Sequence, residues 1–121
     1  MTIGKTHWAI AEGYIPADDP AKSRALISHE ACCILNAGER EADVEIMIFY
    51  SDRDPAGPYR FVVPARRTVH LRFNDFSDPE LIPAGTNYAS TITSSEPIVV
   101  QHTRLDSRGG GIALMSTIAY S

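Results

Sequence analysis

The stretch "VVQHTRLDSR", Val99 to Arg108, is typical of a β-strand that changes character along its length. It begins with two apolar β-branched residues, as a buried strand does, and then places polar side chains at every second position. Because side chains two apart on a strand share a face, these polar groups lie on one side. An unpaired charge against the core is costly. This polar face therefore predicts that the strand lines a pocket, contacts another subunit or ends in solvent. The four residues are His102, Arg104, Asp106 and Arg108.

The rest of the chain consists of similar short segments, β-branched or aromatic, separated by turn residues. Segments such as "DRDPAGP" and "NDFSDPELIPAGTN" are rich in Gly, Pro, Asp and Asn, which supply turn geometry. Only "DDPAKSRALI" and "DPELI" could form a helical turn. The sequence therefore predicts an all-β, antiparallel β-sandwich or jelly-roll-like fold of about eight strands with little helix. We expect strands near Lys5–Glu12, Ile27–Asn36, Val44–Ser51, Tyr59–Val63, Thr68–Asn74, Tyr88–Ser94, Ile98–Leu105 and Ile112–Tyr120.

Length, charge and cysteine content limit the function classes. A chain of 121 residues is expected to form one domain, residues 1–121, with its own core. The formal net charge of -4 disfavours nucleic-acid binding over the whole surface, although a local arginine cluster could bind phosphates. No apolar run has the length of a signal peptide core or a membrane span, so we expect a cytoplasmic protein. The neighbours Cys32 and Cys33 are expected to be reduced packing residues on opposite faces of a strand; a strained vicinal disulfide is the alternative.

Alternation within two strands predicts which residues face the core. In "TVHLRFN", Val69, Leu71 and Phe73 form an apolar face. His70 and Arg72 project from the other face of the same strand. The stretch "VEIMIFYS" is apolar on both faces, which predicts a central strand covered on both sides, with another subunit as a possible second cover.

The first strand places Trp8 and Glu12 on one face together with Ile10. An aromatic ring and a carboxylate suit a polar hydroxylated ligand, which can stack on the ring and donate hydrogen bonds to the carboxylate. The structural alternative is a tryptophan at the edge of the core beside a solvated glutamate.

Long runs of residues, in matching order over nearly the whole chain, carry a family resemblance. In these runs the sequence resembles the sensory rhodopsin transducer family. The runs are "WAIAEGYIP" (Trp8–Pro16), "ISHE" followed by "CILNAG" (Ile27–Gly38), "YSDRDPAGPYR" (Tyr50–Arg60), "VPARRTVHLRFND" (Val63–Asp75), "PIVVQHTRLDSR" (Pro97–Arg108) and "STIAY" (Ser116–Tyr120).

The resemblance implies a cytoplasmic all-β sandwich that assembles as a homotetramer. The namesake of the family couples to a microbial sensory rhodopsin in the membrane, whereas the wider family is a set of small-molecule-binding domains similar to carbohydrate-binding modules. We therefore expect a signalling or sensor protein that binds a small polar, sugar-like ligand and relays a signal through protein contacts. A direct soluble transducer of a membrane photoreceptor rhodopsin is the first alternative.

The residues shared with the family are also those that the alternation of faces selects. His70 and Arg72 on one strand, with His102 and Arg104 on another, would form a cationic concavity if the two strands lie near one another. Because His29 and Glu30 are adjacent, only one of them can point inward unless a bulge intervenes, and Arg66 could bind a carboxylate or phosphate. An ion pair between Arg104 and Asp106 at a subunit interface is the structural alternative. The candidate ligand contacts are Trp8, Glu12, His29, Glu30, Arg66, His70, Arg72, His102 and Arg104.

Catalytic patterns are not found in the sequence. No nucleophile elbow, phosphate-binding glycine loop or close histidine pair is present, so we expect no enzymatic activity, no cofactor and no metal site. A third function class remains open, a regulator that binds DNA through Arg66, Arg67, Arg72 and their symmetry mates. Such binding would weaken steeply as the salt concentration rises.

Overall fold

The central element of the fold is a strand of 20 residues, β6 (Asn87–Asp106), in a computed structural model that describes residues 2–121. The first half of β6 pairs with β1 (Lys5–Tyr14) on one side and with β3 (Ala42–Tyr50) on the other. Strand β4 (Ala56–Val63) lies outside β3. We call these paired strands the first sheet.

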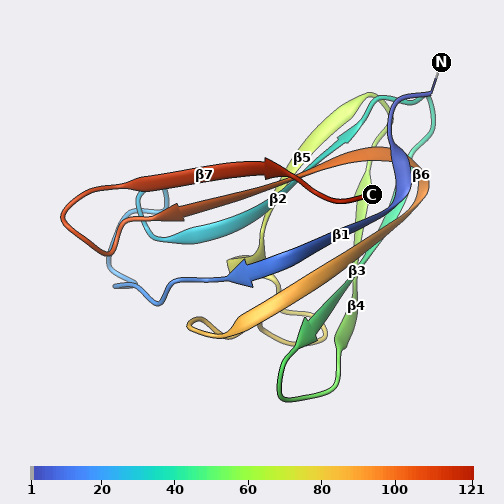
Figure 1. Cartoon of the computed structure of the whole chain (residues 1–121). Helices are drawn as coiled ribbons and strands as arrows, with labels where there is room; N and C mark the ends of the chain where they lie inside the picture. Colours follow the sequence, from blue (N-terminus) through green and yellow to red (C-terminus); the bar gives the residue numbers. More distant parts are fainter. Residues whose placement is uncertain (1) are drawn as a thin grey trace.

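The second half of β6 belongs to another group of strands, which we call the second sheet. It pairs with β2 (His29–Asn36) and with β7 (Ala113–Ile118), and β5 (Arg67–Arg72) lies outside β2. All the pairs in both sheets are antiparallel. Figure 1 shows the two sheets diverging from the shared strand β6, with β7 and β2 on one side and β1, β3 and β4 on the other.

The predicted all-β, antiparallel fold with little helix is confirmed, with seven strands in residues 2–121 where about eight were expected. The segment "SSEP", expected to be a turn, continues in extended conformation within β6. Ser94 still pairs with Val44 in the first sheet, and Val99 already pairs with Leu35 in the second. Turn-forming residues, including Pro97 without an N–H group, are tolerated here because the strand exchanges its partners at this point.

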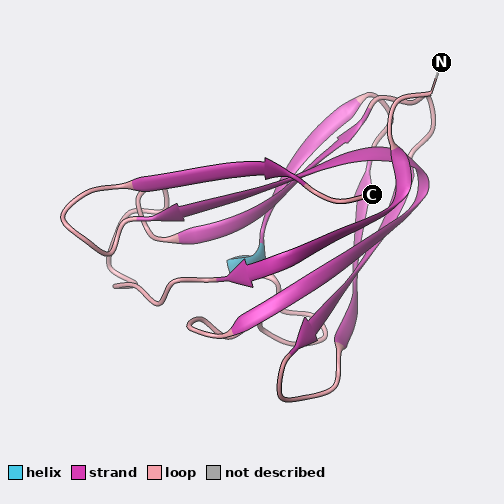
Figure 2. Ribbon diagram, in the orientation of Figure 1, coloured by secondary structure: helices cyan, strands magenta, loops and turns pink. Residues whose placement is uncertain are grey.

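Helix is confined, within residues 2–121, to one 3-10 turn, η1 (Phe73–Asp75), shown in Figure 2. The segment "DDPAKSRALI" forms isolated turns, in which the N–H of Lys22 donates to Asp19 and that of Ile27 to Ser23, at 3.1 and 2.9 Å, whereas "DPELI" forms none. The 3-10 turn η1 replaces the predicted end of a strand. The turn places Phe73 and Phe76 three residues apart, so both rings enter the core, with their centroids 5.0 Å apart. No helix in this part of the chain is long and apolar enough to cross a membrane.

The core lies between the two sheets and follows the predicted faces. Val69 and Leu71 are packed against the core, as expected. Strand β3 lies between β4 and β6, but its outer face is open within one chain, where Phe49 is 40% exposed. The largest fully buried apolar side chains are Tyr59, Phe73, Ile34, Ile46, Ile48, Ile92, Ile98, Val44, Val63 and Val100.

The two cysteines of β2 are free thiols on opposite faces of the strand, as predicted. Cys32 is fully buried, and this burial raises the pKa of its thiol to about 12. A thiol with so high a pKa is not ionised near neutral pH, so Cys32 is a packing residue rather than a nucleophile.

Candidate functional site

Trp8 is a structural residue of the core. Its side chain is 9% exposed, and its indole N–H donates to the backbone carbonyls of Lys5 and Ile98, at 3.0 and 3.1 Å. The expected stacking of a ligand on this ring is therefore not supported, and the structural alternative describes Trp8 better.

A β-bulge separates Glu12 from the core face of β1. Ile10 pairs with Ser90, but the register then shifts, and the next pair is Gly13 with Tyr88. In a regular strand Glu12 would share the buried face of Trp8 and Ile10; the irregularity instead turns it outward, where its side chain is 66% exposed. The predicted shared face thus ends at Ile10.

Glu30 of β2 is a fully buried carboxylate with several hydrogen-bond donors around it. Its Oε1 accepts from the Tyr88 hydroxyl at 2.5 Å and from the Tyr14 backbone N–H at 2.8 Å, and its Oε2 accepts from Nε of Arg104 at 2.5 Å. Burial alone would raise the pKa of Glu30, but His102 and these donors together lower it below its ordinary value. Glu30 is therefore ionised and fixes Arg104.

Arg104 of β6 connects the buried carboxylate to the surface. Its Nη2 donates to both oxygens of Glu12, at 3.0 and 2.9 Å, while Nε contacts Glu30. Within the chain, Arg104 does not pair with Asp106. Asp106, the last residue of β6, is instead paired with Arg108 at 2.8 Å.

His102 lies two residues before Arg104 on the same face of β6 and is 2% exposed. Its buried Nε2 lies 3.3 Å from Oε2 of Glu30, which is its polar neighbour within residues 2–121. His102 thus contacts the same buried carboxylate as Arg104, and its Nε2 is shielded from solvent.

A groove of about 530 Å³ opens beside these residues, between β1 and β7. His102 and Arg104 of β6 line it, with Glu12 on the β1 side and Met115 and Thr117 on the β7 side. The groove forms because both β1 and β7 pair with β6, but in different sheets, so the two strands separate along it. Among residues 2–121 no group of His, Cys, Asp and Glu side chains is arranged to hold a metal ion.

His70 and Arg72 do not belong to this site, contrary to the predicted concavity. Strand β2 lies between β5 and β6. His70 is level with Cys33, whereas His102 is level with Cys32, so the two histidines project from opposite faces of the second sheet. Arg72 is likewise level with Ala31, whereas Arg104 is level with Glu30, so these two arginines also project from opposite faces.

The last two candidates lie outside the groove as well. His29 is half-buried with Nδ1 2.7 Å from the Ile27 carbonyl oxygen, whereas Glu30 points inward, which agrees with the expectation that only one of them does so. Arg66 is exposed, has a φ of 57°, and forms an ion pair with Glu39 at 2.9 Å.

Sequence reasoning missed Tyr88, Met115 and Thr117. Tyr88 is 5% exposed, and the need of a buried tyrosine hydroxyl for a partner is a signal that could have indicated it. The two β7 residues carried no signal, because their position depends on the way β7 leaves β6.

Gly13 makes room for the ring that supports Glu30. A Cβ atom at this position would lie 2.6 Å from Cε2 and 2.7 Å from the carbonyl oxygen of Tyr88. We expect Gly13→Ala to lower the free energy of unfolding by about 1–3 kcal/mol, as overpacking does, in a urea titration. Gly109→Ala is the matched control, since no atom lies within 4 Å of its Cβ, and it should leave stability nearly unchanged. Equal effects would contradict this account.

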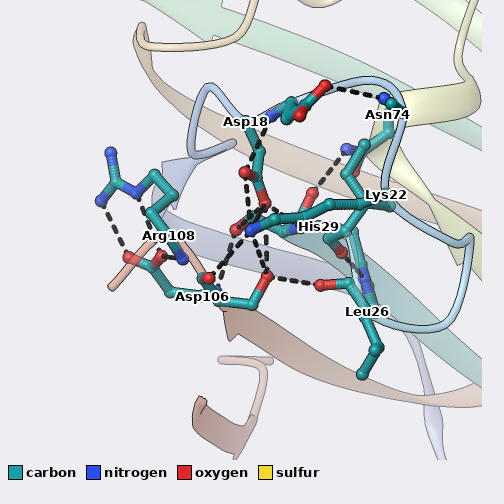
Figure 3. A network of polar contacts seen from close by, with 12 residues as sticks. Asp18, Lys22, Leu26, His29, Asn74, Asp106 and Arg108 are labelled. Carbon is teal, nitrogen blue, oxygen red and sulfur yellow. Dashed lines mark hydrogen bonds and ion pairs between the residues drawn. The ribbon is translucent and has the colours of Figure 1, made fainter. Parts of the chain in front are cut away.

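A second polar cluster, shown in Figure 3, fastens the loop after β1 to the end of β6. The Asp18 carboxylate pairs with Lys22 at 2.9 Å and accepts hydrogen bonds from the backbone N–H and hydroxyl of Ser28, both at 2.9 Å. The Ser107 hydroxyl also contacts Asp18 and donates to the Leu26 carbonyl. The Lys22 ammonium, followed by the Ser28 donors, holds the pKa of Asp18 far below its ordinary value of 3.8.

This pKa predicts part of the acid sensitivity of the fold. Stability that depends on ionised Asp18 is complete above pH 3.8 and is lost as the pH falls toward the lower folded-state pKa. In urea titrations, Asp18→Asn should be less stable than the wild type at about pH 7, and the difference should narrow at about pH 3. Asp54→Asn, at an exposed residue without an ion pair in residues 2–121, should show no such narrowing. A difference independent of pH would refute the prediction.

Comparisons with known proteins agree with this fold. The family model described as "Anabaena sensory rhodopsin transducer" matches residues 3–121. A solved structure of the Anabaena sensory rhodopsin transducer is 60% identical, with a TM-score of 0.77, over 85% of this chain and 99% of that one. The crystal structure of Thermotoga maritima 1070 is 32% identical, with a TM-score of 0.85, over 97% and 94% of the two chains.

Among proteins with curated descriptions, none matches this chain. The family model nevertheless covers nearly the whole sequence, and the first of the two structures exceeds half identity over most of it. The chain therefore belongs to the Anabaena sensory rhodopsin transducer family.

Proposed function

We propose that this protein is a non-catalytic, cytoplasmic sensor that binds a small polar molecule in the β1–β7 groove and passes its state on through protein contacts. The observation that carries the proposal is the Arg104 guanidinium, which Glu30 holds at the wall of a groove of about 530 Å³. A polar ligand in the groove could accept hydrogen bonds from this guanidinium. Membership of the transducer family supports the relay of a signal.

A screen with two variants of β7 tests the binding step. Purified protein is heated with sugars, sugar phosphates, carboxylates or nucleotides; a ligand at one hundred times its Kd adds about 2.7 kcal/mol, enough to raise Tm by several degrees. Thr117→Trp should abolish every shift, because Thr117 lines the groove. Ser116→Trp, on the opposite face of β7, should retain it. The proposal fails if no compound shifts Tm, or if both variants respond like the wild type.

Contacts with other chains would be made by β7. All six of its residues are exposed, with Leu114 at 68%, on an edge strand of the second sheet. Exposed apolar edge strands are suited to protein association. A homotetramer built through this edge would appear in sedimentation velocity, and Leu114→Glu should reduce it to smaller species; a monomeric wild type would refute this part.

Direct transduction from a membrane rhodopsin is the second candidate function. It is favoured by the 60% identity to the Anabaena sensory rhodopsin transducer. Tagged protein should then retain a microbial rhodopsin from a detergent extract of membranes that contain it, and Leu114→Glu should release it. No retention at low salt would count against this candidate.

DNA binding has less support from the geometry. Arg66 is paired with Glu39, and Arg72 donates to the Arg24 carbonyl at 2.7 Å. Arg67 and Arg72 project from opposite faces of β5, so the three arginines do not form one surface. A gel-shift assay at low salt decides the question, since binding through phosphates should be strongest there.

A further inference from the structure

Two carboxylates of different character hold Arg104. The inner one, Glu30, is fully buried and contacts Nε at 2.5 Å. The outer one, Glu12, has a side chain that is 66% exposed and contacts only Nη2. The guanidinium would therefore keep its position through Glu30 if Glu12 moved into solvent.

The contact with Glu12 makes incomplete use of the guanidinium. Both carboxylate oxygens share Nη2, at 3.0 and 2.9 Å, and within residues 2–121 no hydrogen bond uses Nη1 of Arg104. The strongest arginine–carboxylate arrangement has two parallel bonds from two nitrogens. Exposed ion pairs also add little to stability, so a carboxylate that reached Nη1 and Nη2 together could displace Glu12 at small cost.

The groove beyond Arg104 is mainly apolar. Ala9 and Ala11 line its β1 side, and Met115, Ile118 and Tyr120 line the other side. A volume of about 530 Å³ suits a small organic molecule. A ligand with many hydroxyl groups would leave several of them without partners against these walls, which is unfavourable. The body of the ligand should therefore be apolar.

We infer that the groove binds a small organic acid with an apolar body, whose carboxylate replaces that of Glu12 on Arg104. This inference rests on the proposed function, because it names the ligand class of the same groove. The exchange leaves the charge on the guanidinium balanced, since one carboxylate takes the place of another. Glu12 is then an internal competitor that occupies the anion site while the groove is empty.

Isothermal titration with matched compounds tests the inference. Acetate, benzoate and phenylacetate are each compared with the corresponding amide, and glucose and benzylamine represent polyols and amines. We expect acids with an apolar body to bind and their amides not to bind. Glu12→Gln should tighten acid binding about twofold to fivefold, since it removes the competing anion. Glu45→Gln, at another exposed glutamate in an ion pair, should leave it unchanged.

Each other outcome has a defined meaning. Weaker or unchanged acid binding in Glu12→Gln overturns the inference, because Glu12 would then be a ligand contact or a bystander. If glucose or benzylamine binds, Thr117→Trp abolishes that binding and no acid binds, the inference fails while the proposed function stands. If the wild type binds none of the titration compounds and none of the compounds in the thermal screen, the inference and the proposed function both fail.

Discussion

We expect the Glu30→Gln substitution to lower the free energy of unfolding by about 3–5 kcal/mol, the usual cost of removing one partner from a buried ion pair. The amide is nearly the same size as the carboxylate, so packing changes little. The Arg104 guanidinium, only 21% exposed on its side chain, loses its inner negative charge. The Tyr88 hydroxyl can still donate to the amide oxygen. Urea unfolding curves at neutral pH measure the change directly.

Glu12→Gln is the matched control, because it removes a carboxylate from the same guanidinium. The Glu12 side chain is 66% exposed, so its ion pair contributes about 1 kcal/mol or less. Similar small losses in both variants would mean that Arg104 needs no buried partner. The Glu30–Arg104 pair would then not stabilise the fold.

The second large effect is expected for Phe73→Ala, a loss of about 3–5 kcal/mol. Phe73 is 1% exposed, and its ring centroid lies 5.0 Å from that of Phe76 and 5.4 Å from that of Tyr88. Removal of the ring leaves a cavity beneath the tyrosine whose hydroxyl contacts Glu30. The variant should therefore be less stable in urea titrations. Without the ring beneath it, the Tyr88 hydroxyl should also contribute less to lowering the pKa of Glu30.

Phe49→Ala is the same chemical change at an open position. Phe49 is 40% exposed on the outer face of β3, so a loss of about 1 kcal/mol or less is expected for the isolated chain. A loss as large as that of Phe73→Ala would show that another subunit covers this face, as the apolar pattern of "VEIMIFYS" suggested. An equally small loss in both would contradict the position of Phe73 in the core.

The sequence predicted the strands and their inner faces because both depend on a local period of two. Val69 and Leu71 were assigned to the core in this way, and they do pack against it. Strand β6 was divided wrongly, since "SSEP" has the composition of a turn and the local pattern does not show that neighbouring strands exchange there. A choice between a turn and a crossover depends on partners far away in the chain.

The candidate site was predictable only in part for the same reason. Alternation in "VVQHTRLDSR" placed His102 and Arg104 on one face, and both line the groove. His70 was wrongly expected to lie in the same concavity. Whether side chains of β5 and β6 share a face depends on how both strands are in register with β2, which lies between them. Glu12 reached the groove through a bulge that the alternation did not indicate. Register and bulges are set by packing across the sheets, which one strand does not reveal.

The length of β6 has a consequence for how the molecule opens. Four of the other strands, β1, β2, β3 and β7, hydrogen-bond to it directly. Both sheets contain part of β6, so unfolding of this strand removes a hydrogen-bonding partner from each of them. The two sheets should therefore unfold as one cooperative unit. Amide hydrogens of Ile92 and Val100, in different halves of β6, should accordingly exchange with solvent through the same global opening. A change in the position of β6 at the groove would therefore affect the strand pairing of both sheets, because β6 belongs to both.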